Sequence, residues 1–178
     1  MNNQKIAEQL FQKHLQFINY IDSLNEKDFE ETYNQKWSAG QQMDHIYRAI
    51  KPLVQALQLP QFILKLMFGK ANRNSKSYDE LVKKYVQKLE TGGKASGRFL
   101  PKEISISQKQ NLVKRLQKVI EKLIVQVNKL SENELDNIII PHPLLGKITL
   151  REMMYFTIYH VEHHEKITKD NLNTLLSK

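Results

Sequence analysis

The sequence predicts an all-α protein, a four-helix bundle with a long crossover connection between its second and third helices. Apolar residues recur every three or four positions over four long stretches, which is the spacing of one helix face. A Ser or Thr followed three residues later by Gln or Glu marks the start of three of these stretches. Six glycines and five prolines are too few for a turn-rich β sandwich. We expect a single domain that covers residues 1–178.

The first expected helix covers residues 6–24. Its apolar face comprises Ile6, Leu10, Phe17, Ile21 and Leu24. His14 occupies the one vacant step in this face, so its side chain is expected to point toward the interior.

The second expected helix begins at a capping box, in which Ser38 and Gln41 satisfy each other's free amide groups. Its apolar face comprises Met43, Ile46, Ile50, Leu53 and Leu57. Pro52 lies within this stretch and is expected to bend the helix.

The third and fourth expected helices begin in the same way, at Ser107 with Gln110 and at Thr149 with Glu152. The third has the most regular apolar face, which comprises Leu112, Leu116, Val119, Leu123, Val127 and Leu130. The inward line of the fourth comprises Leu150, Met153, Thr157, His160, His164 and Ile167. Two histidines are therefore expected on a buried helix face.

A long connection, residues 59–106, separates the second and third helices, and connections of this length are usually functional or are bundle crossovers. Ser77 begins a further helical run within it, while residues 91–99 are rich in glycine and basic residues. Before the fourth helix, Pro141 and Pro143 interrupt the apolar run 138–146. Because proline stops both helices and sheets, we expect an apolar loop packed under the end of the bundle.

Composition limits the possible chemistry. The 27 Lys and Arg residues against 19 Asp and Glu residues give a net charge of +8. The absence of cysteine excludes disulfides, a thiolate nucleophile and cysteine-ligated zinc or iron–sulfur sites. The first six residues lack the apolar core of a signal peptide, and no stretch has the apolar length of a membrane-spanning helix. We expect a soluble, cytoplasmic protein with no membrane partner.

Histidine placement suggests a metal site. His160 and His164 are four residues apart, so they lie on one helix face with Cβ atoms about 6 Å apart. A helix can offer two imidazoles to one metal ion at this spacing. Two neutral imidazoles in a core are costly without partners, and a divalent metal would satisfy both. The alternative is a pair of partly exposed histidines bonded to backbone or water.

His45, in the second turn of the second helix, could supply a third nitrogen from across the bundle, and its alternative role is that of a boundary histidine. Three protein ligands with an open fourth position are the catalytic pattern of zinc. Three imidazoles alone do not distinguish zinc from nickel, iron or copper. The sequence contains neither the zincin motif nor the glutamate three residues before a histidine that di-iron bundles use.

These residues resemble the signatures of the DinB-like superfamily, which includes the YfiT-type metal-dependent hydrolases. Trp37-Ser38 followed by His45 is similar to the first signature of that family. The segment 142–149, which runs into His160-x-x-His163-His164, is similar to the second. The likeness extends over nearly the whole chain, including the long crossover.

The resemblance implies a DinB-type bundle, often dimeric, in which His45, His160 and His164 hold a divalent metal such as Zn, Ni or Fe. His163 would lie beside the site without being a ligand, because it points about 100° away from His164. Characterised members include transferases and isomerases that use low-molecular-weight thiols such as bacillithiol or mycothiol, while others are described only as hydrolases. We therefore expect a homodimer with a small-molecule substrate, and a hydrolase or thiol S-transferase activity.

Several other residues have expected roles. Lys94, Arg98 and Lys102 form a basic loop that is expected to receive an anionic part of the substrate, the alternative being a solvated, mobile segment. The candidate hydrogen-bond partners of the metal-binding imidazoles are His14, Tyr159 and Glu162. Trp37 is expected to anchor packing at the start of the second helix.

Two functions without catalysis remain open. One is a metal-binding scaffold or sensor that dimerises without turnover. The other is nucleic-acid binding, which the net charge of +8 favours. The basic residues are spread along several helices, however, and no run of five like charges occurs, so a nucleic-acid partner is disfavoured.

Overall fold

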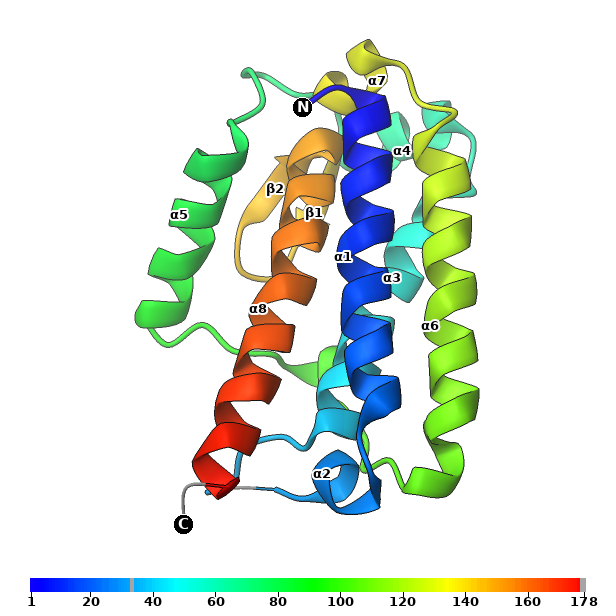
Figure 1. Ribbon diagram of the computed structural model, residues 1–178. Coiled ribbons are helices and arrows are strands. Elements are labelled where there is room, and N and C mark those ends of the chain that lie inside the picture. Colours follow the sequence, from blue (N-terminus) through cyan, green and yellow to red (C-terminus); the bar gives the residue numbers. More distant parts are fainter. Residues whose placement is uncertain (33, 177–178) are drawn as a thin grey trace.

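The computed structural model describes residues 1–32 and 34–176, and these residues form a mostly helical fold with one small sheet (Figure 1). The elements in chain order are α1 (Asn3–Ser23), α2 (Glu26–Glu30), α3 (Ala39–Leu57), α4 (Gln61–Phe68), α5 (Tyr78–Glu90), the 3₁₀ turn η1 (Gly97–Phe99), α6 (Ile106–Val127), α7 (Glu132–Asn137), β1 (Ile139–His142), β2 (Gly146–Thr149) and α8 (Leu150–Leu176). The predicted all-α class is therefore confirmed, with a two-stranded sheet as its one addition among these residues.

The four longest helices, α1, α3, α6 and α8, pack along one another. Figure 1 shows α1 between α8 and α6, with α3 behind them. α1 packs against α6 and α8, and α3 packs against the same two helices. Their apolar faces form the core, in which the large fully buried side chains include Ile6, Leu10, Phe17, Ile21, Met43, Ile46, Leu112, Leu116 and Leu123. His14 is also buried, as its place in the apolar face of α1 predicts.

The helix starts follow the capping signals, with one correction. Ser38 and Gln41 form the predicted capping box of α3, and Thr149 and Glu152 exchange the same pair of hydrogen bonds at the start of α8. The third long helix begins two residues before the predicted position, because Ser105 and Gln108 form its capping box in place of Ser107 and Gln110. The earlier start is favoured because the N–H of Ile106 donates to the carboxylate of Glu30, the last residue of α2, at 2.5 Å.

The crossover between α3 and α6 is partly helical. α5 begins at the predicted cap, Ser77, and packs against α8, whereas the short helix α4 was not predicted. α5 ends where Gly92, with φ +89°, turns the chain and Gly93 donates to the Lys88 carbonyl at 2.8 Å. The basic loop then passes behind α8 in Figure 1 and reaches α3 through η1.

The segment before α8 is a β-hairpin, so its prediction as a loop is wrong. β1 and β2 pair antiparallel, with Pro141 opposite Lys147 and His142 opposite Gly146. Both strands of a two-stranded ribbon are edge strands, so Pro141 can lie in one of them although it has no N–H to donate. Gly146 has φ +75°, a conformation that suits the turn and that glycine adopts without strain. The predicted apolar packing is correct, because Ile140, Leu145 and Ile148 are buried in the core.

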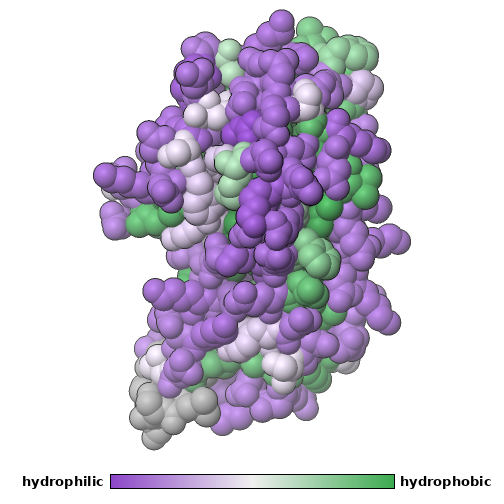
Figure 2. Space-filling model, turned by 45° about the horizontal axis from the view of Figure 1, so that its top comes forward, coloured by the Kyte–Doolittle hydropathy of each residue, from purple (hydrophilic) through white to green (hydrophobic). Residues whose placement is uncertain are grey.

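The surface is mostly hydrophilic, with a cluster of exposed apolar side chains near one end. In Figure 2 hydrophobic side chains gather at the upper right edge, at the end of the molecule that carries α4 in Figure 1. α4 exposes Phe62, Leu66 and Met67. Among the described residues no helix is both long and apolar enough to cross a membrane.

Candidate metal centre and its cavity

Three histidine side chains converge in the interior between α3 and α8. His160 and His164 lie one turn apart on α8, and their Nε2 atoms are 3.0 Å apart. His45 reaches them from α3, and its Nε2 lies 3.2 Å from the Nε2 of His160. All three side chains are buried, and the three residues offer ligand atoms that lie within 4.8 Å of one another. They could hold a metal ion.

The distances between these nitrogens are those expected between ligands of one metal ion. Nitrogen ligands bind zinc at about 2.0–2.1 Å, so two of them at angles of 90–109° are separated by about 2.9–3.4 Å. The two Nε2–Nε2 distances, 3.0 and 3.2 Å, lie in this range. The sequence predicted these three residues as ligands, and the fold brings their nitrogens together.

The protons of these imidazoles can be counted. The Nδ1 atom of His45 lies 2.7 Å from the Phe99 carbonyl oxygen, which only accepts hydrogen bonds, so the proton of His45 is on Nδ1. The Nδ1 atom of His164 likewise lies 2.5 Å from the Gln42 side-chain oxygen. The Nε2 atoms of His45 and His164 therefore both present lone pairs to the Nε2 of His160. A neutral imidazole carries one proton, so His160 can satisfy one of them at most.

The surroundings keep the three rings neutral. Burial lowers the pKa of His45, and it lowers the pKa of His160 and His164 well below the ordinary value. A positive charge on a neighbouring histidine would lower the pKa of His160 and His164 further, whereas at His45 the hydrogen bond to Phe99 and the charge of Asp44 oppose the effect of burial without cancelling it. Protonation of the three rings is therefore unfavourable, so their converging Nε2 atoms carry more lone pairs than N–H protons. A divalent cation between the three nitrogens would accept all of these lone pairs.

The hydrogen-bond partners of the histidines differ from the predicted ones. Gln42 and the backbone carbonyl of Phe99 hold His164 and His45, and neither was predicted. The predicted partners lie elsewhere. His14 bonds to the Leu10 carbonyl, Tyr159 stacks on His163, and Glu162 pairs with Lys13 and Tyr78. The prediction was wrong because it considered neighbours on α1 and α8 only, whereas the partners belong to α3 and to the basic loop.

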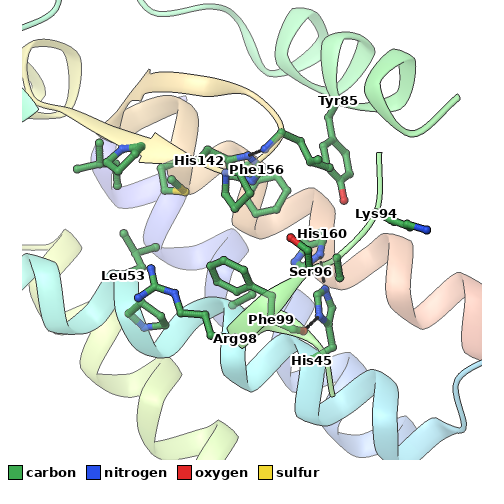
Figure 3. Close-up of a pocket in the computed structure, with 18 of the residues that line it drawn as sticks. His45, Leu53, Tyr85, Lys94, Ser96, Arg98, Phe99, His142, Phe156 and His160 are labelled. Carbon is green, nitrogen blue, oxygen red and sulfur yellow. Dashed lines mark hydrogen bonds between the residues drawn. The ribbon is translucent and has the colours of Figure 1, made fainter. Parts of the chain in front are cut away.

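A cavity of about 280 Å³ adjoins the three histidines (Figure 3). Its walls are mainly apolar, and their side chains include Leu53, Phe68, Leu89, Ile140, Leu144, Met153 and Phe156. The three histidines, Trp37 and His163 also line it. Small-molecule sites are typically concave and apolar with a few polar groups, and this cavity has the size of a small one. A ligand in it would lie against the histidine cluster.

Two further predictions concern residues beside the cluster. Trp37 stacks on His164, with ring centroids 6.3 Å apart and planes 12° apart, so it packs on the site as well as at the helix start. His163 is partly buried and lies outside the three-histidine group, as its direction on the helix predicts.

The three basic residues of the loop lie in different surroundings. Lys94 and Arg98 line the cavity, whereas Lys102 does not. The side chain of Lys102 is exposed, and its backbone N–H donates to Asp44 at 2.9 Å. The expectation that all three basic residues face a substrate is therefore wrong for Lys102, because η1 turns the chain away from the cavity before that residue.

Two more polar residues of the cavity were not predicted to have a role. Tyr85 extends from α5 with its hydroxyl group toward the cavity, and His142 lies at the end of β1 (Figure 3). The signals were available in the sequence, since Tyr85 lies on the apolar face of its helix and His142 belongs to the second signature segment. Neither signal indicates a cavity without the tertiary structure.

The fold and the histidine cluster together define a helical protein with a candidate three-histidine metal centre. The sequence model of the DinB superfamily matches residues 33–167, so the chain belongs to this superfamily. The resemblance seen in the sequence is thereby confirmed. No curated protein matches the chain. A solved structure of a conserved protein from Enterococcus faecalis has a similar fold, with a TM-score of 0.64 and 14% sequence identity, over 100% of this chain and 99% of the other.

Proposed function

We propose that this protein binds one divalent metal ion through the Nε2 atoms of His45, His160 and His164. The carrying observation is the proton count, because hydrogen bonds to Phe99 and Gln42 direct two lone pairs at a third imidazole that has at most one proton. We also propose that α1, α3, α6 and α8 form a four-helix bundle of the DinB type within one domain, which holds the ligands on two rigid helices.

We further propose that the protein is a metal-dependent enzyme, either a hydrolase or a low-molecular-weight-thiol S-transferase. A divalent metal held by His45, His160 and His164 would supply Lewis acidity, which lowers the pKa of water or of a thiol. The residues of the chain orient the site: Gln42 and Phe99 fix the imidazole tautomers, and the apolar cavity walls exclude bulk water from a bound small molecule. Zn, Ni and Fe are all compatible with this ligand set.

The first experiment is metal stoichiometry on protein without an affinity tag. We expect about one divalent ion per chain in the wild type by elemental analysis, and none in the His160→Ala, His164→Ala double variant. His163→Ala is the matched control, since it removes a neighbouring imidazole of α8 outside the group, and it should retain the metal. Circular dichroism of each variant checks that the helices remain. A wild type that contains no metal and takes up none on titration would overturn the proposal.

A second experiment separates the enzyme from a non-catalytic scaffold or sensor. Hydrolysis and thiol-transfer substrates are tested with and without a chelator, and we expect turnover that chelation abolishes and metal restores. A metal-loaded protein without turnover on either set would favour the scaffold. The small-molecule substrate and the homodimer remain predictions, and sedimentation analysis tests the second. Retention on DNA that falls with salt would instead favour nucleic-acid binding.

A further inference from the structure

His142 has a fixed tautomer in the wall of the cavity. It lies at the end of β1, is 8% exposed, and its Nδ1 atom accepts hydrogen bonds from the backbone N–H groups of Leu144 and Leu145, each at 3.1 Å. A ring nitrogen that accepts two N–H bonds carries no proton, so the proton of the neutral ring is on Nε2. Burial, with the nearby charge of Lys84, lowers the pKa of His142 to about 4, which keeps this ring neutral.

The Nε2–H group of His142 has no hydrogen-bond partner among residues 1–32 and 34–176. Its ring packs edge-on against Phe156, with centroids 4.2 Å apart, and against Tyr85 at 6.4 Å. Among the described residues, the fully enclosed side-chain atoms that lack a partner are Nε2 of His14 and Nδ2 of Asn171. The Nε2–H of His142 is therefore accessible from the cavity that His142 lines, and a ligand bound there can accept its hydrogen bond. His142 therefore offers the cavity one hydrogen-bond donor in a fixed position.

Further groups that can donate hydrogen bonds line the cavity outside the histidine cluster. Tyr85 and Ser96 contribute hydroxyl groups, and Lys94 and Arg98 contribute cations. Lys94 and Arg98 are exposed and therefore lie at the mouth of the cavity. Within the described part of the chain neither of these cations pairs with a carboxylate, and no Asp or Glu lines the cavity. These charges at the mouth favour an anionic organic ligand over a cationic one.

We propose that the cavity binds a small organic acid, whose hydrocarbon or aromatic body packs against the apolar wall and whose carboxylate accepts from His142. Arg98 and Lys94 at the mouth supply the opposite charge, which offsets the cost of taking a carboxylate out of water. This inference deepens the proposed function, on which it rests, because it names the class of molecule that would lie beside the metal centre. His142 is thereby a specificity-determining residue for that ligand.

The test uses benzoate as the probe and benzamide, which has a similar shape without the charge, as its neutral counterpart. Binding is measured by calorimetry on chelator-treated protein, so that ligation of benzoate to a metal does not contribute. We expect benzoate to bind at least tenfold more tightly than benzamide. Arg98→Ala and His142→Phe should each weaken benzoate binding about tenfold or more, the loss for one hydrogen bond to a charged group.

Two further variants keep the test independent of folding. His142→Gln preserves both an acceptor for the backbone amides and a donor for the ligand, so it should bind benzoate within about threefold of the wild type. Lys102→Ala removes a charge from the same loop outside the cavity, so it should bind benzoate as the wild type does. Equal affinity for benzoate and benzamide, or benzoate binding that neither Arg98→Ala nor His142→Phe weakens, would overturn the proposal.

A spectroscopic measurement tests the donor directly. Nitrogen NMR of protein labelled at histidine should report the Nε2–H tautomer for His142, and the signal should move when benzoate is added. An Nδ1–H tautomer would overturn the proposal. Metal stoichiometry on the same protein before chelator treatment, and again after titration with metal, separates the two proposals: selective benzoate binding by a protein that takes up no metal refutes the metal centre alone. A metal-loaded protein that shows no preference for benzoate refutes the organic-acid site alone.

Discussion

Two buried polar clusters lie along α8, and they differ in how their hydrogen bonds balance. The first is the ionic cluster around Glu152, in the first turn of the helix. Glu152 is 0% exposed, yet it accepts hydrogen bonds from two nitrogens of Arg73, at 2.7 and 2.8 Å, and from the backbone N–H groups of Lys76 and Thr149. Burial alone would raise the pKa of Glu152, but these donors outweigh it and hold the pKa below the ordinary value.

The second is the histidine cluster, two to three turns further along the same helix. Its outer nitrogens on His45 and His164 are satisfied by Phe99 and Gln42, but its inner nitrogens are not satisfied, because lone pairs outnumber protons there. The difference teaches how the two clusters act. A buried cluster whose donors match its acceptors needs no further partner, whereas one with converging lone pairs is suited to accept a cation.

Removing the carboxylate of the ionic cluster should give the largest loss of stability. Glu152→Ala removes a buried carboxylate and leaves two backbone amides without acceptors, while the partly exposed Arg73 can turn to water, so we expect the free energy of unfolding to fall by about 3 kcal/mol. Urea denaturation measures it. Glu8→Ala, which breaks the exposed pair with Lys5, is the control and should cause no measurable change. An unchanged urea midpoint for Glu152→Ala would contradict the structural role of this cluster.

Adding metal should stabilise the protein through the histidine cluster alone. At a free zinc concentration 100 times the dissociation constant, the free energy of unfolding should rise by about 2.7 kcal/mol. The rise should vanish in His160→Ala and persist in any Glu152 variant that still folds. Thermal denaturation with zinc and with chelator measures both. A zinc effect of equal size in His160→Ala would show that the ion binds elsewhere.

A third buried polar group, His14, should make the stability of the protein depend on pH. Only one of its two ring nitrogens has a hydrogen-bond partner, so its hydrogen bonding is intermediate between that of the Glu152 cluster and that of the histidine cluster. Its Nδ1 is bonded to the Leu10 carbonyl at 2.7 Å, while its Nε2 has no partner among the described residues. Burial lowers the pKa of His14 to about 4, from an ordinary value near 6.5. The unfolded chain therefore takes up the proton first, so stability is present above pH 6.5 and is lost as the pH falls toward 4.

When the pH is lowered from 7 to 5, His14 alone should reduce the free energy of unfolding by about 2 kcal/mol. Urea denaturation of chelator-treated wild type and His14→Leu at both pH values isolates the effect, since the other histidines are common to the two proteins. The variant should lose less stability on acidification than the wild type. Equal losses would mean that His14 does not carry the pH dependence.

The smallest expected effect concerns the hydrogen bond that orients His164. Gln42→Ala removes the acceptor that holds its Nδ1 proton, so the affinity for metal should fall about tenfold while the ligands remain. Competition with a chelator of known affinity measures the change. Gln55→Ala, an exposed position on the same helix, is the matched control and should bind metal normally. An unchanged affinity in Gln42→Ala would mean that the ligands orient themselves without this contact.

The sequence predicted the features that depend on near neighbours. The four long helices follow from apolar spacing, and the capping boxes at Ser38 and Thr149 give two of their starts. The pair His160 and His164 follows from one helical turn, and their burial follows from the face they share. The capping signal was ambiguous only where two such patterns overlap, at Ser105 and Ser107, and a distant contact with Glu30 decided between them.

The sequence did not predict the hairpin or the partners of the histidines. Pro141 argued against a strand, and its place in a two-stranded ribbon depends on how β1 and β2 pair. Phe99 lies 54 residues from His45, and Gln42 lies 122 residues from His164. No local pattern links residues so far apart, so only the packing of α3, η1 and α8 brings them together.

The sequence by itself determined which side chains face the core, since a helix places every third or fourth residue on one face whatever packs against it. It thereby placed three imidazoles inside a helical protein. The tertiary structure decided which ring nitrogens of those imidazoles are free to act as metal ligands. Only contacts across the chain place the protons of His45 and His164 on Nδ1, and the lone pairs that make their Nε2 atoms possible ligands depend on that placement.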